Sequence, residues 1–190
     1  MNKADNIKPN KTFIPFLVLL VASGVFASDA YIPFLPIMQH QLHTSAHALQ
    51  STIAIYILGL CLGQIFFGPL SDKVGRKPII VCGVILLIFS SAAAALSTNI
   101  LIFSAARILQ GLGAATGISM ARSMLRDLYS GNKLAKSIAT FSIANSLTPA
   151  AAPVVGAYIG HHFGWHSIFW FLVIMYCINL FICIIKIIFN

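Results

Sequence analysis

Six long runs of apolar residues, separated by short polar connections, decide what this chain is able to fold into. Each run is long enough to cross a bilayer, which takes about 20 helical residues. Only 8% of the residues are charged, against about a quarter in a water-soluble domain. The pattern predicts an all-α integral membrane protein with lipid around it and six transmembrane helices at about 13–38, 49–67, 79–96, 100–120, 138–159 and 167–188.

We expect one bundle over residues 13–189, preceded by a basic leader over residues 1–12. The first apolar run also admits a second interpretation, because a basic start, an apolar segment from Phe13 and small residues near Ala27 are features of a cleaved signal peptide. Apolar character resumes after Asp29 and continues to Met38. The total length therefore favours a transmembrane helix that crosses the bilayer with some tilt.

The basic residues are distributed unevenly among the connections. Ten of the twelve Lys and Arg lie in the leader, in the connection after the second run and in the connection after the fourth run. Basic connections face the cytoplasm, so both termini are expected there. The net charge of +8 does not predict a nucleic-acid partner, because nucleic-acid binding needs a basic face rather than basic helix ends.

Neither a metal site nor an enzyme is expected. All six histidines fall on the side opposite the basic connections, where neutral histidine is a tolerable polar residue at a membrane boundary. A spacing such as His43 and His47 is compatible with metal ligation but does not require it. The chain contains no glutamate, no nucleophile-elbow serine and no metalloprotease helix motif.

Two ionisable residues lie well inside apolar runs, Asp29 in the first and Arg107 in the fourth. A charge near the middle of a bilayer costs at least about 2.5 kcal/mol, so such a residue is a functional candidate. The rise of about 1.5 Å per residue places the two at matching depth. They either neutralise each other or line a polar cavity. In the second case Asp29 loads and releases a proton, because desolvation and a nearby cation act on its pKa in opposite directions.

Glycine and proline mark two further segments. Pro149 and Pro153 lie in the fifth run, where each proline removes a backbone hydrogen bond and bends a helix. Gly156 and Gly160 follow at a spacing that lets helices approach closely. Between the second and third runs, the segment 68–80 holds the densest cluster of charge, and its glycines and prolines predict a tight turn.

The sequence GPLSDKVGRKPII resembles the signature of the major facilitator superfamily in the loop between its second and third helices. The segment ARILQGLGAATG resembles the fourth-helix signature of proton-coupled antiporters, and it contains Arg107, Gln110 and Gly111. Four further segments are similar to drug:proton antiporters of the bicyclomycin and chloramphenicol resistance (Bcr/CflA) type: DAYIPFLP, RDLYSG, TPAAAPVVGAYIG and GWHSIFWF. The loop signature is matched at Gly68, Leu70, Asp72, Gly75, Arg76, Lys77 and Ile80.

This resemblance implies proton-driven efflux of drug-like molecules across a bacterial inner membrane, with a proton gradient and no cofactor. It implies that Asp29 is the membrane carboxylate, that Arg107 tunes it with Gln110 nearby, and that the charged loop switches the conformation. The family's fifth helix usually carries a glycine pair, whereas this chain has Gly156 followed by Ala157. The loop residues to which the resemblance assigns the switch are Gly68, Asp72, Gly75, Arg76 and Lys77.

The length of the chain departs from the family, whose members have two six-helix halves built from inverted repeats. The sequence supplies only the first half, a 3+3 bundle in which residues 74–77 and 163–166 occupy equivalent places. A missing C-terminal half is therefore an expected partner. Two alternatives stay open: a metabolite transporter of the same superfamily, and a non-transporting remnant or a half that needs a second chain.

Overall fold

The computed structural model describes residues 13–188, and its regular structure over this range is helical. The predicted basic leader, residues 1–12, lies outside the described residues. Six helical segments of the described chain are long and apolar enough to cross a membrane, which confirms the predicted fold class. The elements are α1 (Phe13–Asp29), η1 (Ile32–Phe34), α2 (Leu35–Gln41), α3 (Ala46–Val74), α4 (Arg76–Ala95), α5 (Ile100–Leu128), α6 (Gly131–Phe163) and α7 (His166–Ile188).

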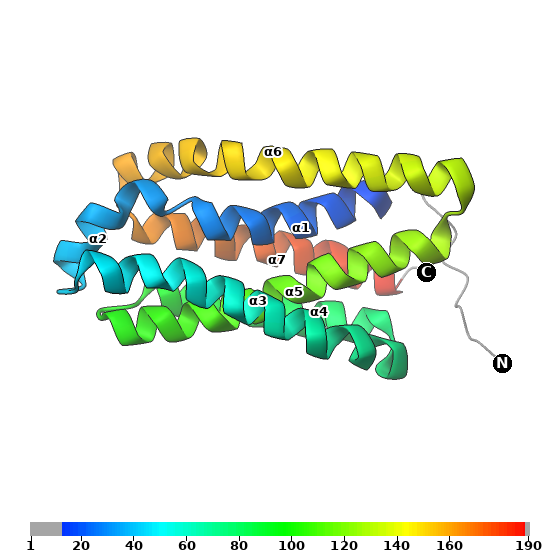
Figure 1. The fold of residues 1–190 in the computed structure, drawn as a ribbon, viewed down its shortest axis with the longest axis horizontal. Helices are drawn as coiled ribbons and strands as arrows, with labels where there is room; N and C mark the ends of the chain where they lie inside the picture. The colour runs from blue at the N-terminus through cyan, green and yellow to red at the C-terminus, as the bar shows by residue number, and fades with distance from the viewer. Residues whose placement is uncertain (1–12, 189–190) are drawn as a thin grey trace.

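Helices α1 and α5 are central in the bundle. Helix α5 packs against α3 and α4, and α1 packs against α5, α6 and α7. Figure 1 shows α6 along one side of the bundle and α3 along the other, with α1 between them. Because α1 and α5 each contact helices on both sides, side chains at their interface are removed from the bilayer.

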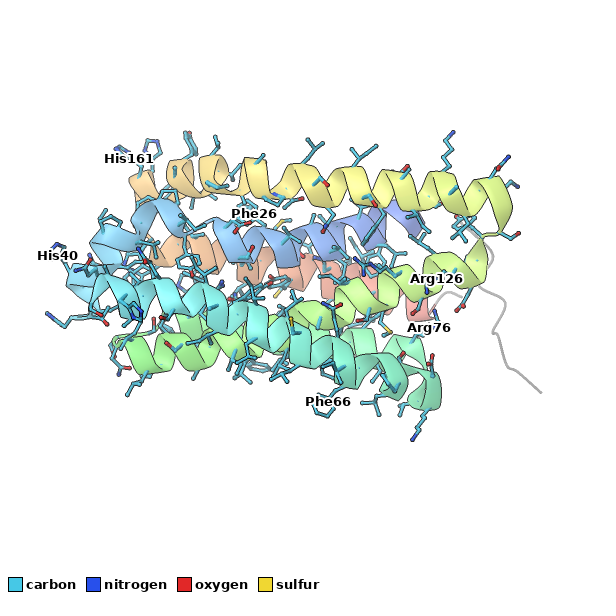
Figure 2. All side chains as sticks on the ribbon, in the orientation of Figure 1. Phe26, His40, Phe66, Arg76, Arg126 and His161 are labelled. Carbon is cyan, nitrogen blue, oxygen red and sulfur yellow. The ribbon has the colours of Figure 1, made fainter. Side chains whose placement is uncertain are left out.

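The two ends of the bundle differ in charge. Figure 2 shows His40 and His161 at one end and Arg76 and Arg126 at the other. The glycine-containing junction of α3 and α4 and the connection of α5 to α6 lie at the basic end. The sorting of basic residues along the sequence therefore corresponds to one end of the folded bundle.

The first transmembrane segment is broken, which corrects the continuous helix predicted over residues 13–38. Helix α1 ends at Asp29, and a turn leads into η1 and then α2, which ends at Gln41. Pro33 and Pro36 are the second residues of η1 and α2, respectively. A proline has no N–H to donate to the carbonyl four residues earlier. Pro33 thus leaves the Asp29 carbonyl without its helical donor, and the break falls at the acidic residue.

The prediction of a tight turn over Gly68–Ile80 is wrong about the length of the turn. Helix α3 continues through Gly68 and Pro69 to Val74, and α4 begins at Arg76, so Gly75 alone separates the two helices. The Ser71 hydroxyl donates to the Gly68 carbonyl at 2.7 Å. The carbonyl that loses its helical donor at Pro69 is that of Ile65, four residues earlier, and the helix nevertheless continues. Most of the charged stretch is consequently helical.

Helices α5 and α6 also extend beyond the apolar runs predicted at 100–120 and 138–159. Helix α5 continues to Leu128 and α6 begins at Gly131. Arginine and lysine are good helix formers, and polarity alone does not end a helix once it leaves the hydrocarbon. The helices therefore project their basic ends past the apolar segment, with only residues 129–130 between them.

Glycines allow α3 and α5 to come together at backbone distance. A Cβ added at Gly59 would fall on the carbonyl oxygen of Ile108, and one at Gly111 would fall on the carbonyl oxygen of Tyr56. Similarly, Gly156 of α6 faces the Ala30 carbonyl, at the break that follows α1. Close backbone approach through small residues is a principal source of helix association in lipid.

The junctions α3–α4 and α6–α7 have the same local geometry. Gly75 has φ 99° and ψ 158°, and Gly164 has φ 80° and ψ 160°. Their N–H groups donate to the carbonyls four residues earlier, at 3.0 Å from Gly75 and 2.9 Å from Gly164. A positive φ of this size favours glycine. Gly75 and Gly164 thus have equivalent backbone conformations, as the internal repeat over residues 74–77 and 163–166 predicts.

Replacement of Gly59 by alanine tests the importance of the α3–α5 contact. The new methyl group meets a backbone oxygen that cannot rotate away, so we expect a loss of about 1–3 kcal/mol in the free energy of unfolding. Thermal unfolding in detergent, followed by circular dichroism, measures the loss. Ala54→Leu adds volume at an exposed position of the same helix and serves as the control. Equal effects of the two substitutions would contradict the assigned interface.

Candidate functional site

Arg107 lies fully buried on α5 and connects three helices. Its Nη1 donates to the Ala27 carbonyl of α1 at 2.9 Å and to Gln110 Oε1 at 2.7 Å. Gln110 Nε2 in turn donates to Ser91 Oγ of α4 at 2.7 Å. Because Arg107 and Gln110 are one helical turn apart, they share one face of α5. The sequence-predicted pair is therefore the centre of a polar network within the bundle.

Two tyrosine rings enclose the guanidinium. Its Cζ lies 4.7 Å from the ring centroid of Tyr31 and 4.4 Å from that of Tyr56. Tyr56 donates its hydroxyl hydrogen to the Gly24 carbonyl at 2.7 Å, and the hydroxyls of Tyr31 and Thr52 are 2.9 Å apart. A desolvated cation is attracted to such ring faces by about 2 kcal/mol or more. The rings and carbonyls supply partial negative charge where no carboxylate is paired.

Asp29 lies at the end of α1, two residues beyond the carbonyl that Arg107 binds. Its side chain is half-buried. Among the side chains that the structure describes, the one ion pair joins Arg76 and Asp127. Asp29 and Arg107 therefore do not form an ion pair with each other. The Asp29 carboxyl group therefore lies at the helix break without an ion-pair partner in the described chain.

Arg107 has hydrogen-bonding capacity that its observed contacts do not use. Its Nε and Nη2 are buried and make no hydrogen bond to the described part of the chain. An unused buried donor costs about 1–3 kcal/mol. Such a cation retains the capacity to attract an anionic oxygen.

The polar network continues toward α7 through α1. Tyr176 donates to the Ser23 carbonyl at 3.0 Å, and Asn179 Nδ2 donates to Ser23 Oγ at 3.3 Å. Both α7 side chains are fully buried. Helix α1 thus has polar contacts with α5 on one side and α7 on the other. A movement of α1 would therefore change hydrogen bonds to both helices.

The charged loop forms a second, separate group at the basic end of the bundle. Arg76 Nη1 lies 2.7 Å from Asp127 Oδ2 at the end of α5. Lys77 is half-buried, Gly68 is half-buried within α3, and Asp72 and Gly75 are exposed. The structure therefore connects Arg76 to α5, while it leaves the Asp72 carboxylate facing outward.

The residues predicted for helix bending fall at different places on α6. Pro149 and Pro153 lie inside the helix, Pro149 exposed and Pro153 half-buried. Gly156 and Gly160 are buried and contact Ala30 and a ring edge of Phe34, respectively. The two glycines therefore hold α6 against the break that contains Asp29, whereas Pro149 does not face the bundle.

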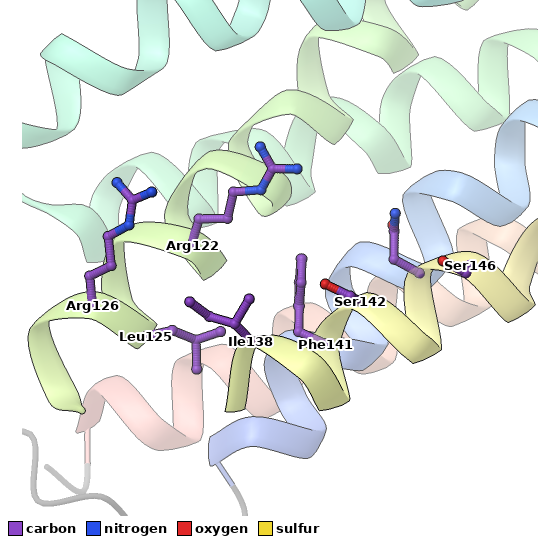
Figure 3. Close-up of a pocket in the computed structure, with 8 residues that line it drawn as sticks. Arg122, Leu125, Arg126, Ile138, Phe141, Ser142 and Ser146 are labelled. Carbon is purple, nitrogen blue, oxygen red and sulfur yellow. The ribbon is translucent and has the colours of Figure 1, made fainter. Parts of the chain in front are cut away.

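A pocket of about 400 Å³ opens between α5 and α6 near the basic end. Figure 3 shows Arg122 and Arg126 extending from α5, with Phe141, Ser142 and Ser146 on α6. None of the pocket's lining residues was predicted from the sequence as part of a site. Its lining consists of Arg122, Leu125, Arg126, Ile138, Phe141, Ser142, Asn145 and Ser146.

Several partners of the predicted residues were also missed. Tyr31, Tyr56 and Ser91 are neutral residues in apolar runs, and nothing in their spacing distinguishes them from packing residues. Asp127 had a signal, since it belongs to the segment RDLYSG that resembles the antiporters. For metals, the described residues contain no group of three or more His, Cys, Asp or Glu side chains close enough to hold an ion.

Comparison with known proteins identifies relatives over most of the chain. A family model described as Major Facilitator Superfamily matches residues 17–189. Multidrug resistance protein D of Escherichia coli is 32% identical over 166 residues, covering 87% of this chain and 42% of that protein. A bicyclomycin resistance protein homolog of Haemophilus influenzae is 35% identical over 161 residues, covering 84% of this chain and 40% of that protein.

A similar fold occurs in a solved structure of the proton:xylose symporter XylE. The TM-score is 0.77 at 15% identity, and the match covers 92% of this chain and 45% of the symporter chain. The chain therefore spans less than half the length of the relatives it matches.

Replacement of Arg107 by methionine distinguishes a functional cation from a structural one. Burial of an unpaired charge costs several kcal/mol, which offsets the hydrogen bonds and ring contacts that the guanidinium makes. We expect the free energy of unfolding to change by less than about 2 kcal/mol. Phe103→Ala, one turn earlier on α5 in the core, is the comparison, with an expected loss of about 3–5 kcal/mol. Similar losses in a thermal unfolding assay would make Arg107 a structural residue.

The Arg76–Asp127 ion pair is expected to contribute little to stability. Its side chains are 25% and 54% exposed, and pairs in such positions contribute about 0–1 kcal/mol. Asp127→Asn should lower the unfolding free energy by no more than about 1 kcal/mol, with the difference shrinking at high salt. Asp72→Asn, near the end of α3 and without an ion-pair partner in the described chain, is the control. A large loss that persists at high salt would contradict this view.

Proposed function

The chain belongs to the major facilitator superfamily and corresponds to its N-terminal half, and we propose that it is the proton-coupling half of a drug exporter. The exporter would move drug-like molecules out across a bacterial inner membrane in exchange for entering protons. The observation that supports this proposal most directly is the unpaired Asp29 carboxyl at a helix break, two residues from the carbonyl held by Arg107.

In the proposed mechanism, the charge of Arg107 stays constant and the charge of Asp29 changes. The deprotonated carboxylate is attracted toward the unused Nε and Nη2 donors of the guanidinium. Protonation removes this attraction and releases the segment after α1. Because α1 also accepts a hydrogen bond from Tyr176 of α7, and Ala30 directly after α1 faces Gly156 of α6, the change in one carboxyl group is passed to both helices.

The charged loop has a separate proposed role as a conformational switch. Arg76 binds Asp127 at the basic end of the bundle, which we place in the cytoplasm together with both termini on the positive-inside rule. The exposed Asp72 carboxylate would contact the other six-helix half in one conformation only. The switch residues Gly68, Asp72, Gly75, Arg76 and Lys77 then belong to conformational exchange rather than to proton transfer.

Drugs are favoured over metabolites as substrates because the relatives are a multidrug resistance protein and a bicyclomycin resistance protein homolog. Transport of a metabolite remains the alternative within the superfamily. The other alternative is a six-helix chain that transports only with a second chain, since the matched relatives are more than twice as long.

Proton release from inverted membrane vesicles tests the proposed function. Chloramphenicol or another substrate is added to energised vesicles, and loss of the internal proton gradient is followed with a pH-sensitive dye. We expect a substrate-dependent loss of the gradient, absent in Asp29→Asn because a neutral amide cannot load a proton. Ser28→Ala, the adjacent half-buried position on α1, should behave like the wild type.

The same assay separates the alternatives. Vesicles that hold this chain together with the C-terminal six helices of Multidrug resistance protein D test the need for a second half. A response only in the combined vesicles would support the coupling half acting with a partner. No response in either preparation, or an unchanged response in Asp29→Asn, would overturn the proposed coupling.

A further inference from the structure

We propose that the pocket between α5 and α6 binds the acidic group of an amphipathic molecule that also carries a hydrogen-bond donor. This inference rests on the proposed function, because it names the class of substrate or lipid that the transporter half accepts near its basic end. The pocket has about 400 Å³ of space, enough to hold part of a drug-sized molecule.

The positive charge of the pocket is concentrated on one face of α5. Arg122 and Arg126 are four residues apart, so their side chains leave the same face one turn from each other, as Figure 3 shows. No acidic residue lines the pocket. The nearest acid along the chain, Asp127, is bound to Arg76. Two like charges on successive turns repel each other, and an anion between them removes that repulsion.

The sorting of basic residues by membrane orientation does not account for this arrangement. Lys133 and Lys136 lie in the same basic region at the start of α6, and both are exposed without lining the pocket. These two lysines supply the positive charge that the positive-inside rule requires, although they lie outside the pocket. Arg122 and Arg126 instead border a hollow, and arginine presents a planar fork that binds a carboxylate or phosphate through two hydrogen bonds.

The remaining walls define the rest of the ligand. Leu125, Ile138 and Phe141 provide an apolar surface beside the arginines. On the α6 side, Asn145 Oδ1 is buried and accepts no hydrogen bond from the described chain. An unpaired buried acceptor of this kind is satisfied by an N–H or O–H donor of a bound molecule. The expected ligand therefore combines an acidic group, an apolar body and a nearby amide or hydroxyl donor.

Three probes with one fluorophore test the charge preference. Dansylglycine is an acid with a sulfonamide N–H, its methyl ester is neutral, and dansylcadaverine is a cation. Binding to the purified chain in nanodiscs of neutral lipid is followed by dansyl fluorescence at low ionic strength. We expect the acid to bind at least about tenfold more tightly than the ester, as charge-assisted hydrogen bonds to arginine imply.

Matched double variants locate the preference. Arg122→Gln with Arg126→Gln should remove the tenfold preference, and Arg122→Lys with Arg126→Lys should keep most of it because the charge remains. Lys133→Gln with Lys136→Gln removes the same net charge outside the pocket and should leave the preference unchanged. Equal binding of acid and ester by the wild type, or equal losses in the two glutamine variants, would overturn the proposal.

Nanodiscs that contain phosphatidylglycerol distinguish the two sources of the acidic group. If this lipid weakens dansylglycine binding to the wild type but not to the arginine-to-glutamine variant, the site takes an anionic lipid headgroup. If the lipid has no effect, the site takes a free amphipathic acid. Because binding is measured without a proton gradient, loss of the acid preference and loss of proton-linked transport are separate results, and each inference fails independently.

Discussion

A guanidinium buried without a paired carboxylate sets the arrangement of the helices around it. In a bilayer such a group has no water, so protein groups must satisfy its charge and its donors. Arg107 donates hydrogen bonds to a backbone carbonyl of α1 and to the Gln110 amide of its own helix, which in turn donates to Ser91 of α4. Tyrosine rings from the segment after α1 and from α3 lie over the guanidinium. Four of the six spans therefore contribute groups that contact or enclose one side chain. The close packing of α3 on α5, which Gly59 and Gly111 allow, brings Tyr56 to the distance at which it covers the cation.

The sequence predicts the number of spans, the sorting of charge and the central position of Arg107 because each depends on properties that a single residue or run displays. Apolar length identifies a span, and a charge within such a run is conspicuous. The break after Asp29 was also encoded, by Pro33 and Pro36, but the apolar run continues across it and hydropathy alone does not reveal it. Pro69 misled in the opposite direction, since α3 continues through it to Val74. The presence of a proline in the sequence therefore does not by itself tell whether a helix ends there or continues.

Other parts of the site had no signal in a single sequence. Tyr31, Tyr56 and Ser91 contribute through distances between helices, and those distances depend on how α3, α4 and α5 pack. The pocket beside Arg122 and Arg126 arises in the same way, because the helices extend past their apolar runs and bring residues from two elements together. Sequence patterns locate charges along each helix, whereas the faces that meet are fixed only when all the helices are packed.

The junctions between α3 and α4 (Gly75) and between α6 and α7 (Gly164 and Trp165) also bear on how the chain enters the membrane. One or two residues span at most about 7 Å, so the end of α3 and the start of α4 remain adjacent at every stage, and the same holds for α6 and α7. Neither junction is long enough for one helix of the pair to cross the bilayer while the other helix stays at the membrane surface. During biosynthesis each pair must therefore partition into lipid as a helical hairpin, and the six spans are assembled from two such hairpins together with α1 and α5, the two helices whose interface buries Arg107.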